Sequence, residues 1–391
     1  MECYDFAVVG AGIAGASFAA RAAQAARVLV LEQETAPGYH ATGRSAALFS
    51  QLIGDQSVRA LTAASRPFLD HPPAGFCDYP LLTPREALHI GAPHRAAQAA
   101  QLETLPHTRK MSPHAALERV PVLRGQAAIH AILEPGACDI DVNALHQGFI
   151  KWARSQGARF QNRARVRAMS RGSDAWTIET SAGRFRAHTI VNAAGAWADE
   201  VAKLAGAQTV GLQPFRRSAA VVELPDQLTA AHWPAVIEIG ETFYFKPDAG
   251  RLLLSPADES PSPPCDAQPE DWDIAVAIDR VEKATRLHIK HVIQRWAGLR
   301  TFAPDRLPVV GYDSQLAGFF WLAGQGGFGV QTAPALSQFA AALALDQPFA
   351  EELQAHGLTD RNRFSPSRSP NSIFSPLRSV ENEPFLMDSS Q

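Results

Sequence analysis

The fold of this chain is decided by residues 5–32, which read DFAVVGAGIAGASFAARAAQAARVLVLE. The β-branched and aromatic run at 5–9 predicts a buried strand, and the run at 27–31 predicts a second one. Between them, the alanine-rich stretch 13–25 has no helix breaker after its glycines and predicts a helix. A strand, a helix and a second strand in this order are typical of one βαβ unit.

The glycines of this unit have the spacing of a dinucleotide-binding loop. Gly10, Gly12 and Gly15 follow the first strand in a G-x-G-x-x-G pattern. The first glycine permits the tight turn, the second lets backbone N–H groups approach a pyrophosphate, and the third lets helix and strand pack closely. The helix N-terminus offers partial positive charge to phosphates, and Glu32 can accept hydrogen bonds from ribose hydroxyls. This complete set favours a dinucleotide site over a plain structural turn.

Other glycine-bearing segments are spread along the chain. GRSAA at 43–47 follows a turn-like segment, and we expect it to begin a second helix that faces a phosphate or a ring. A strand-like run leads into glycine at 188–197, and another leads into the glycine-rich 319–329, before an alanine-rich helix at 332–345. The N-terminus of that helix suits the negative charge of a reduced flavin. Junctions so far apart fit an extended cofactor such as FAD better than NAD.

Composition limits the class of protein. The 391 residues suggest two or three domains, because single cores stop growing near ~250–300 residues. With 46% hydrophobic residues and a net charge of −3, the chain is neither disordered nor built to attract nucleic acid or an anionic membrane. Its four cysteines lack CxxC spacing, so we expect no metal, no disulfide framework and a cytoplasmic location. The apolar run 6–20 is too short and too interrupted by glycine to span a membrane.

Together these segments resemble the FAD-dependent D-amino acid oxidase superfamily. The resemblance rests on the N-terminal unit, GRSAA, VNAAGAWAD at 191–199 and GQGGFGVQT at 324–332. Within the superfamily the chain looks most similar to the bacterial D-arginine dehydrogenase group, through the segments GLQPFRRSA (211–219), FYFKPDAG (243–250) and WAGLRTF (296–302).

The resemblance implies an α/β fold in which a Rossmann-like FAD-binding domain is interleaved with an α+β substrate domain on a largely antiparallel sheet. The FAD-binding domain is expected at 1–50, 140–215 and 300–360, and the substrate domain at 51–139 and 216–299. Strand-like runs separated by turn signals in 216–257 agree with this division. The Ser/Pro-rich segment 361–391 is expected to form a flexible tail.

The resemblance also implies that FAD is bound noncovalently. No cysteine follows Cys265, whereas relatives with covalent flavin attach it through a cysteine in the C-terminal region. The residues expected to contact FAD are Gly10, Gly12, Ile13, Ala14, Gly15, Glu32, Gln33, Arg44, Ser45, Ala46, Ala47, Val166, Ala194, Gly195, Trp197, Gly326, Gly327, Phe328, Gly329, Val330 and Gln331.

An amino acid substrate needs its carboxylate held, and arginine is suited to bidentate carboxylate binding. By resemblance, Arg217 and Arg300 bind the carboxylate, Tyr244 donates a hydrogen bond to it, and Gly327 and Gln331 contact the amine or carboxylate end. The alternatives are an ion pair between domains for Arg300 and core packing for Tyr244.

The predicted pocket wall departs from the D-arginine dehydrogenase pattern. Its residues are Leu48 for histidine, Ser50 for threonine, Ile53 for a lid tyrosine, Ala87 for the acidic residue that holds the guanidinium, Ala235 for methionine and Ile237 for valine. Glu86 is adjacent to the missing acid, but strand alternation sends it to the opposite face. The acidic partner of a cationic side chain is therefore expected to be absent.

The sequence thus predicts an FAD-dependent D-amino acid dehydrogenase that prefers a neutral or apolar side chain over arginine. Hydride transfer to flavin N5 would give the imine, and then the 2-oxo acid and ammonia. The electron acceptor, a quinone or O₂, is left open. An FAD enzyme acting on an amine within a larger biosynthetic molecule is one alternative. A flavin-binding scaffold is another, which the retained carboxylate clamp disfavours. Asp139 and Asp141 are expected to form a turn and a helix cap rather than a catalytic pair.

Overall fold

The computed structural model describes residues 2–225 and 227–368, and its first sheet has eight strands. The order along this sheet is β10-β11-β12-β1-β2-β9, with β20 also paired to β12 and β19 paired to β20. The strands are β1 (Cys3–Val9), β2 (Val28–Leu31), β9 (Arg159–Gln161), β10 (Val166–Arg171), β11 (Trp176–Thr180), β12 (Gly183–Asn192), β19 (Val309–Tyr312) and β20 (Phe319–Ala323). Strands β12, β1, β2, β9 and β20 are parallel, and β10, β11 and β19 add antiparallel pairs.

The glycine loop joins β1 to helix α1 (Ile13–Ala22), as the sequence pattern predicts, although the helix ends three residues before Ala25. Gly10 has a φ of +102°, and a Cβ there would lie 2.5 Å from the carbonyl oxygen of Ala193. A Cβ on Gly15 would lie 1.9 Å from the carbonyl oxygen of Gly10. Only glycine permits this close crossing of strand, helix and the end of β12.

Alternate residues of β1 face two different cores. Phe6 and Val8 pack with helices α1, α5 (Val142–Ser155) and α8 (Gly329–Ala344), whereas Ala7 and Val9 pack with α6 (Ala198–Ala205) on the other face. This period of two is the geometry of a strand buried on both sides. Helix α8 begins at Gly329, three residues before the predicted start.

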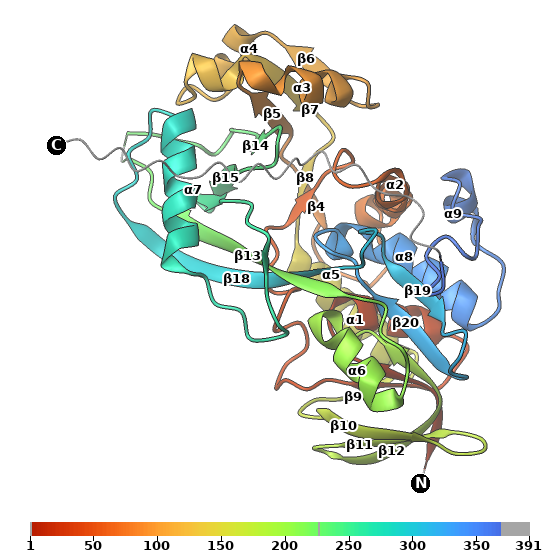
Figure 1. The fold of residues 1–391 in the computed structure, drawn as a ribbon. Coiled ribbons are helices and arrows are strands. Elements are labelled where there is room, and N and C mark those ends of the chain that lie inside the picture. Colours follow the sequence, from red (N-terminus) through yellow and green to blue (C-terminus); the bar gives the residue numbers. More distant parts are fainter. Residues whose placement is uncertain (1, 226, 369–391) are drawn as a thin grey trace.

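Helix α2 (Gln56–Asp70) corrects the predicted division of the chain. It was assigned to the substrate domain through the range 51–139, but Val58, Leu61 and Leu69 are buried in the core that α1 and α8 share. Figure 1 shows α2 beside α8, and the two helices are in contact. The polar and apolar residues of α2 alternate at helical spacing, which predicts a buried face but not the element against which it packs.

The second sheet has nine strands, and its main order is β17-β13-β16-β15-β14-β5-β7-β6, with β18 paired to β13. The strands are β5 (Ala87–Gly91), β6 (Arg109–Met111), β7 (His130–Glu134), β13 (Gln213–Val222), β14 (Ala235–Glu238), β15 (Tyr244–Asp248), β16 (Arg251–Ser255), β17 (Ser260–Pro261) and β18 (Val292–Phe302). All pairs except β14–β5 are antiparallel.

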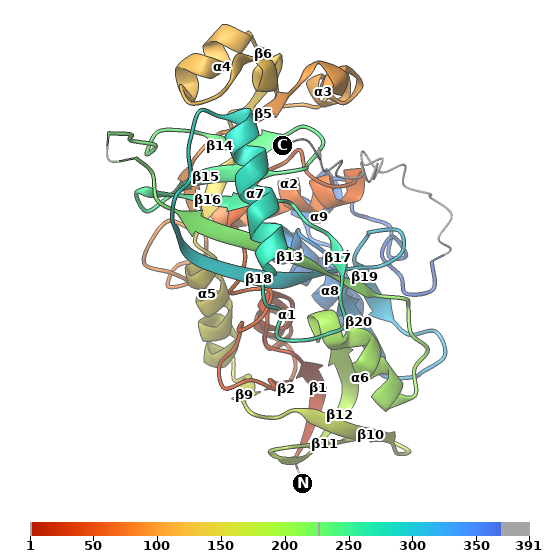
Figure 2. The same ribbon diagram turned by 60° about the vertical axis from the view of Figure 1, so that its left-hand side comes forward.

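Helices pack on both faces of this second sheet. Helix α7 (Asp271–Ala284) packs on β13 and β16, while α3 (Ala96–Glu103) and α4 (Pro113–Arg119) lie at the end formed by β6 and β7 (Figure 2). A small sheet of β3 (Leu48–Phe49), β8 (Cys138–Ile140) and β4 (Leu82–Pro84) lies in the segments that connect the two large sheets. The chain thus passes repeatedly between two sheets, and the fold is mixed α/β, as predicted.

The start of the predicted flexible tail is wrong. Phe364 is 0% exposed and stacks edge-on against Phe339 of α8, and its carbonyl accepts a hydrogen bond from Val310 N at 2.7 Å. Arg368 binds both carboxylate oxygens of Asp305, at 2.6 and 2.7 Å. Two anchors within a polar, proline-rich segment are enough to hold 361–368 on the eight-stranded sheet. Residues 369–391 of the predicted tail lie outside the described residues.

No helix among the described residues is long and apolar enough to cross a membrane.

Candidate functional site

One cavity follows the C-terminal ends of β1, β2 and β12 and continues to β18 and the glycine-rich loop before α8. Parallel strands open their carboxyl ends to ligands at such an edge. The predicted FAD contacts that line it are Gly10, Gly12, Ile13, Ala14, Glu32, Gln33, Arg44, Ser45, Ala46, Val166, Ala194, Gly195, Trp197, Gly326, Gly327, Gly329 and Val330. The predicted contacts that do not line it are Gly15, Ala47, Phe328 and Gln331.

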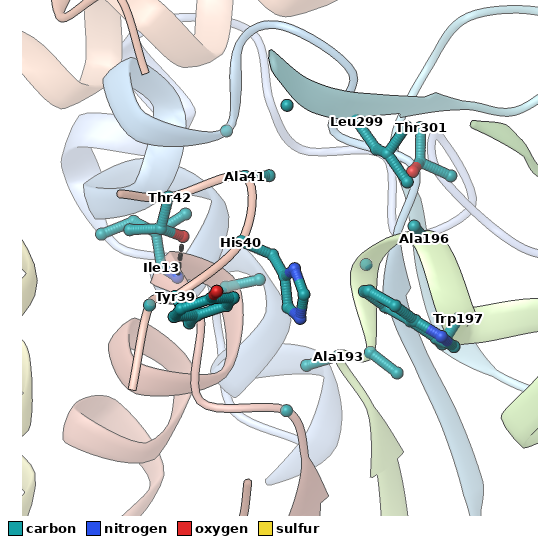
Figure 3. Close-up of a pocket in the computed structure, with 18 of the residues that line it drawn as sticks. Ile13, Tyr39, His40, Ala41, Thr42, Ala193, Ala196, Trp197, Leu299 and Thr301 are labelled. Carbon is teal, nitrogen blue, oxygen red and sulfur yellow. Dashed lines mark hydrogen bonds between the residues drawn. The ribbon is translucent and has the colours of Figure 1, made fainter. Parts of the chain in front are cut away.

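Two side chains hold the glycine loop in shape. Glu32 is buried at the end of β2, and its carboxylate accepts hydrogen bonds from Ala11 N at 2.8 Å and Glu34 N at 2.9 Å. Thr42 Oγ1 accepts a hydrogen bond from Ile13 N at 3.0 Å, at the first turn of α1 (Figure 3). The sequence pattern could not show Thr42, because it reaches the helix from a segment with no regular structure.

The segment around Thr42 brings aromatic rings to the cavity. His40 lies between Tyr39 and Trp197, with ring centroids 5.0 and 4.6 Å away, and Figure 3 shows His40 and Trp197 facing the same space. The sequence analysis did not predict the place of His40 on the cavity wall. The predicted helix at 43–47 is wrong, since these residues form turns and irregular chain, and Ala47 has a left-handed φ of +59°.

The Arg44 side chain points toward the nine-stranded sheet. Its guanidinium donates to the carbonyl oxygens of Ala267 at 2.8 Å and Ala297 at 3.0 Å, and it forms an ion pair with Asp266. This pair lowers the pKa of the Asp266 carboxyl. Arg44 therefore links the segment after β2, which lines the cavity, to β18 and to the loop that contains Asp266 and Ala267.

The two predicted carboxylate-binding arginines lie on the same cavity wall with Tyr244, on the strands β13, β18 and β15. Arg300 is half-buried, and its guanidinium forms no hydrogen bond or ion pair with any described residue. Burial, followed by the like charge of Arg217, lowers the pKa of Arg300 to about 10. It therefore stays protonated at neutral pH. Gly327 contacts it closely, since a Cβ there would lie 2.9 Å from Arg300 Nη1.

Arg217 differs from Arg300 because its guanidinium already donates two hydrogen bonds within the protein. It donates to the carbonyl oxygen of Asp258 at 2.7 Å and to Glu259 at 3.2 Å. Arg306 donates to the same Glu259 oxygen at 2.9 Å. The neighbouring Arg216 binds Asp273 and Glu270 on the other face of β13, as strand alternation predicts. Arg217 thus forms an ion pair with a carboxylate that it shares with Arg306, whereas Arg300 forms no ion pair with a described residue.

An apolar cluster adjoins Tyr244. Leu48, Ala87, Ala235 and Ile237, all predicted for the substrate pocket, pack together there with Ala137, which the sequence analysis missed. They come from β3, β5 and β14 and the turn before β8, and register places Ile237 opposite Tyr244 and Ala235 opposite Ala87. Because the members of the cluster come from distant segments, only the fold brings them together.

The four predicted residues of this cluster do not line the cavity themselves, and neither do the remaining residues predicted for the pocket wall. Ser50 is buried, Ile53 lies in the segment between β3 and α2, and neither lines the cavity. Gln331 uses its amide inside the protein: Oε1 accepts from Ser50 N at 3.2 Å, and Nε2 donates to Ser50 O at 3.1 Å and Thr62 Oγ1 at 2.9 Å. In this arrangement Gln331 has no free donor for a substrate.

Three acidic residues near this cluster already have partners within the protein. Glu86 pairs with Arg119 of α4. Asp141 caps α5 by accepting from Ala144 N at 2.7 Å, as predicted, while Asp139 binds Arg85 and Lys246, each at 2.7 Å. No group of three or more His, Cys, Asp or Glu side chains within 2–225 and 227–368 is placed to hold a metal.

Comparison with known proteins identifies the family. The model described as FAD dependent oxidoreductase (DAO) matches residues 5–343, so the chain belongs to this family. Mitochondrial dimethylglycine dehydrogenase from Homo sapiens is 27% identical over 243 residues, which are 56% of this chain and 28% of that protein. The chain spans little more than a quarter of the length of the dimethylglycine dehydrogenases that it matches.

Two solved structures share the fold. Glycine oxidase from Geobacillus kaustophilus has a TM-score of 0.80 at 21% identity, over 94% of this chain and 100% of that one. L-proline dehydrogenase from P. horikoshii has a TM-score of 0.79 at 20% identity, over 93% and 97%. At this identity the two matches show the fold alone, and they do not test the finer likeness to D-arginine dehydrogenase.

The residues present fit FAD, the cofactor of the family. The glycine loop after β1 leaves no room for side chains, and a second loop with left-handed Gly324 (φ +72°) and Gly326 (φ +56°) lies at the other end of the cavity. The first loop, with Glu32, would hold the pyrophosphate and ribose, and the second, with the N-terminus of α8, would border the ring. One elongated cavity joins both loops to Arg300 and Tyr244.

Proposed function

We propose that this protein catalyses the FAD-dependent oxidative deamination of an amino acid, in the D configuration and with a neutral or apolar side chain. The observation that carries the proposal is the Arg300 guanidinium on the wall of the cofactor cavity, which forms no ion pair with any residue that the structure describes. A cation without a protein partner, partly removed from water, favours a ligand with a carboxylate. Because Arg217 is held by Glu259, the substrate carboxylate would bind mainly to Arg300.

The chain's own residues would bind and orient the substrate. Arg300 holds the carboxylate, and the Tyr244 hydroxyl, which borders the same cavity, donates a second hydrogen bond to it. Bound FAD supplies the electron acceptor. Oxidation removes the Cα hydrogen with its electron pair and a proton from the amine, and water then hydrolyses the imine to a 2-oxo acid and ammonia. No histidine stands at position 48, so the amine must lose its ammonium proton to solvent or to a water near Tyr244.

The side-chain preference follows from the apolar cluster beside Tyr244. Leu48, Ala87, Ala235 and Ile237 do not line the cavity but pack against Tyr244, so a substrate side chain that reached past Tyr244 would meet hydrocarbon. The acid paired to this cluster, Glu134 opposite Ala87, already accepts hydrogen bonds from Ser50 and Gln51. A guanidinium or ammonium group would be desolvated there without a free partner. Losing such a charged contact costs on the order of 3 kcal/mol, so D-arginine should be disfavoured by about 100-fold. The D configuration rests on the sequence resemblance.

The experiment is steady-state turnover of paired D- and L-amino acids with an artificial electron acceptor, followed by identification of the 2-oxo acid. We expect apolar D-amino acids to give the highest kcat/KM. Arginine as the best substrate would contradict the side-chain assignment, and better turnover of L-isomers would contradict the configuration. The rate should rise with pH until the bound amine is neutral, whereas a flat profile from about pH 6 to about pH 10 would contradict this route.

A further inference from the structure

A buried carboxylate joins the nine-stranded sheet to the segment between β3 and α2. Glu134, the last residue of β7, is 1% exposed. It accepts hydrogen bonds from Ser50 Oγ at 2.7 Å and from Gln51 N at 2.7 Å. Both donors belong to the segment that follows β3 and leads to α2. The carboxylate therefore ties the nine-stranded sheet to a segment outside it.

The contacts continue from this segment to helix α8. The Ser50 backbone forms two hydrogen bonds with the Gln331 side chain. Ser50 N donates to Gln331 Oε1 at 3.2 Å, and Gln331 Nε2 donates to Ser50 O at 3.1 Å. Gln331 lies in the first turn of α8, next to Gly329 and Val330, which line the cavity. Leu48, two residues before Ser50, belongs to the apolar cluster at Tyr244. One chain of contacts thus reaches both the N-terminus of α8 and the cluster beside Tyr244.

A histidine completes the junction on the sheet. His89 on β5 is 4% exposed, and its Nε2 lies 3.6 Å from Glu134 Oε2 without a hydrogen bond to any described residue. It points to the same face of the sheet as Ala87, two residues earlier on β5. Glu134 is therefore enclosed by donors, which is the condition under which a buried carboxylate is tolerated.

We propose that Glu134 is a positioning residue. It fixes the N-terminus of α8 and the apolar cluster that contains Leu48 relative to Arg300 and Tyr244. The proposal deepens the proposed function and rests on it for the catalytic effect. An apolar residue at 134 would leave the Gln51 N–H and the Ser50 hydroxyl proton without their acceptor in the interior. The segment would then shift, and a displacement near 1 Å can lower a rate by about 100-fold.

The test compares Glu134→Ala with Glu238→Ala in the FAD-loaded protein. Glu238 is also a buried carboxylate, on β14, and it accepts three hydrogen bonds. Its donors, Arg95 and Thr242, belong to segments that connect strands of the nine-stranded sheet. Hydrogen exchange by mass spectrometry requires no substrate. It therefore tests the junction even if no amino acid is oxidised, in which case only the proposed function fails.

We expect Glu134→Ala to speed exchange of the backbone amides at 48–53 and 329–335 by about tenfold or more, while Glu238→Ala leaves both segments unchanged. Flavin reduction at saturating substrate should fall about tenfold in Glu134→Ala, with a smaller change in KM. Glu134→Gln should restore both properties, because its amide can accept from Gln51 N and donate to Ser50 Oγ. If Glu134→Ala does not fold, Ser50→Ala should give the same exchange pattern in weaker form. Equal exchange in the Glu134 and Glu238 variants, or in Ser50→Ala and the unmodified protein, would overturn the proposal.

Discussion

Replacing Arg300 by methionine should remove the site of carboxylate binding without loss of the fold. The side chain keeps much of its length, and the guanidinium has no hydrogen bond to a described residue that would be broken. Burial and the like charge of Arg217 lower the pKa of Arg300 to about 10, so the charged guanidinium lacks a counter-ion that a bound carboxylate would supply. Hydrogen bonds between a charged guanidinium and a carboxylate contribute up to about 3 kcal/mol, so the loss of Arg300 should weaken carboxylate binding by about 100-fold.

The assay is the dissociation constant of a simple carboxylate that lacks an amine, measured from the change in the visible flavin spectrum. Arg306→Met is the matched control. Arg306 is an arginine of the same region, paired with Glu259, but it does not line the cavity. We expect the control to change affinity by less than about threefold, as for a partly exposed ion pair. The free energy of unfolding of Arg300→Met without ligand should be equal or higher, because an unpaired cation is removed from a half-buried site. Unchanged carboxylate affinity in Arg300→Met would refute the reasoning.

Three other predictions concern pH, the core and the glycine loop. Because Arg300 is charged only below its pKa, carboxylate affinity should be constant from pH 7 to 9 and fall about tenfold per pH unit above about 10. A spectral titration in which the affinity stays constant to about pH 11 would contradict this. Phe364→Ala should lower the free energy of unfolding by about 3 kcal/mol in chemical denaturation, whereas a loss below about 1 kcal/mol would remove Phe364 from the core. Gly15→Ala should abolish retention of FAD on gel filtration, since its Cβ would clash with Gly10 O; Gly125→Ala, with open space around it, is the control, and normal retention by Gly15→Ala would contradict the loop geometry.

The parts of the fold that were predicted correctly depend on local pattern. The first βαβ unit is encoded within about thirty consecutive residues, so the strands, the glycine loop and the helix follow from spacing alone. The same holds for Asp141, whose capping bond reaches only to Ala144. Arg217, Arg300 and Tyr244 were assigned by resemblance, and the structure brings all three to one wall.

The parts that were not predicted depend on contacts between distant segments. The buried face of α2 is visible in sequence, but its partner α8 lies more than 250 residues away. Phe364 and Arg368 sit in a polar, proline-rich context, and only Phe339 and Asp305 show that they are anchors. Gln331 was expected at the substrate, but Ser50 and Thr62 take its donors and acceptor.

The most direct test of the proposed function is anaerobic reduction of the bound flavin by single D- and L-amino acids. The account predicts that apolar D-amino acids bleach the visible flavin absorbance, and that Arg300→Met needs about 100-fold more substrate for the same effect. Bleaching by arginine in preference to apolar side chains would contradict the pocket assignment. No bleaching by any amino acid, in protein that retains FAD, would contradict the proposed function itself.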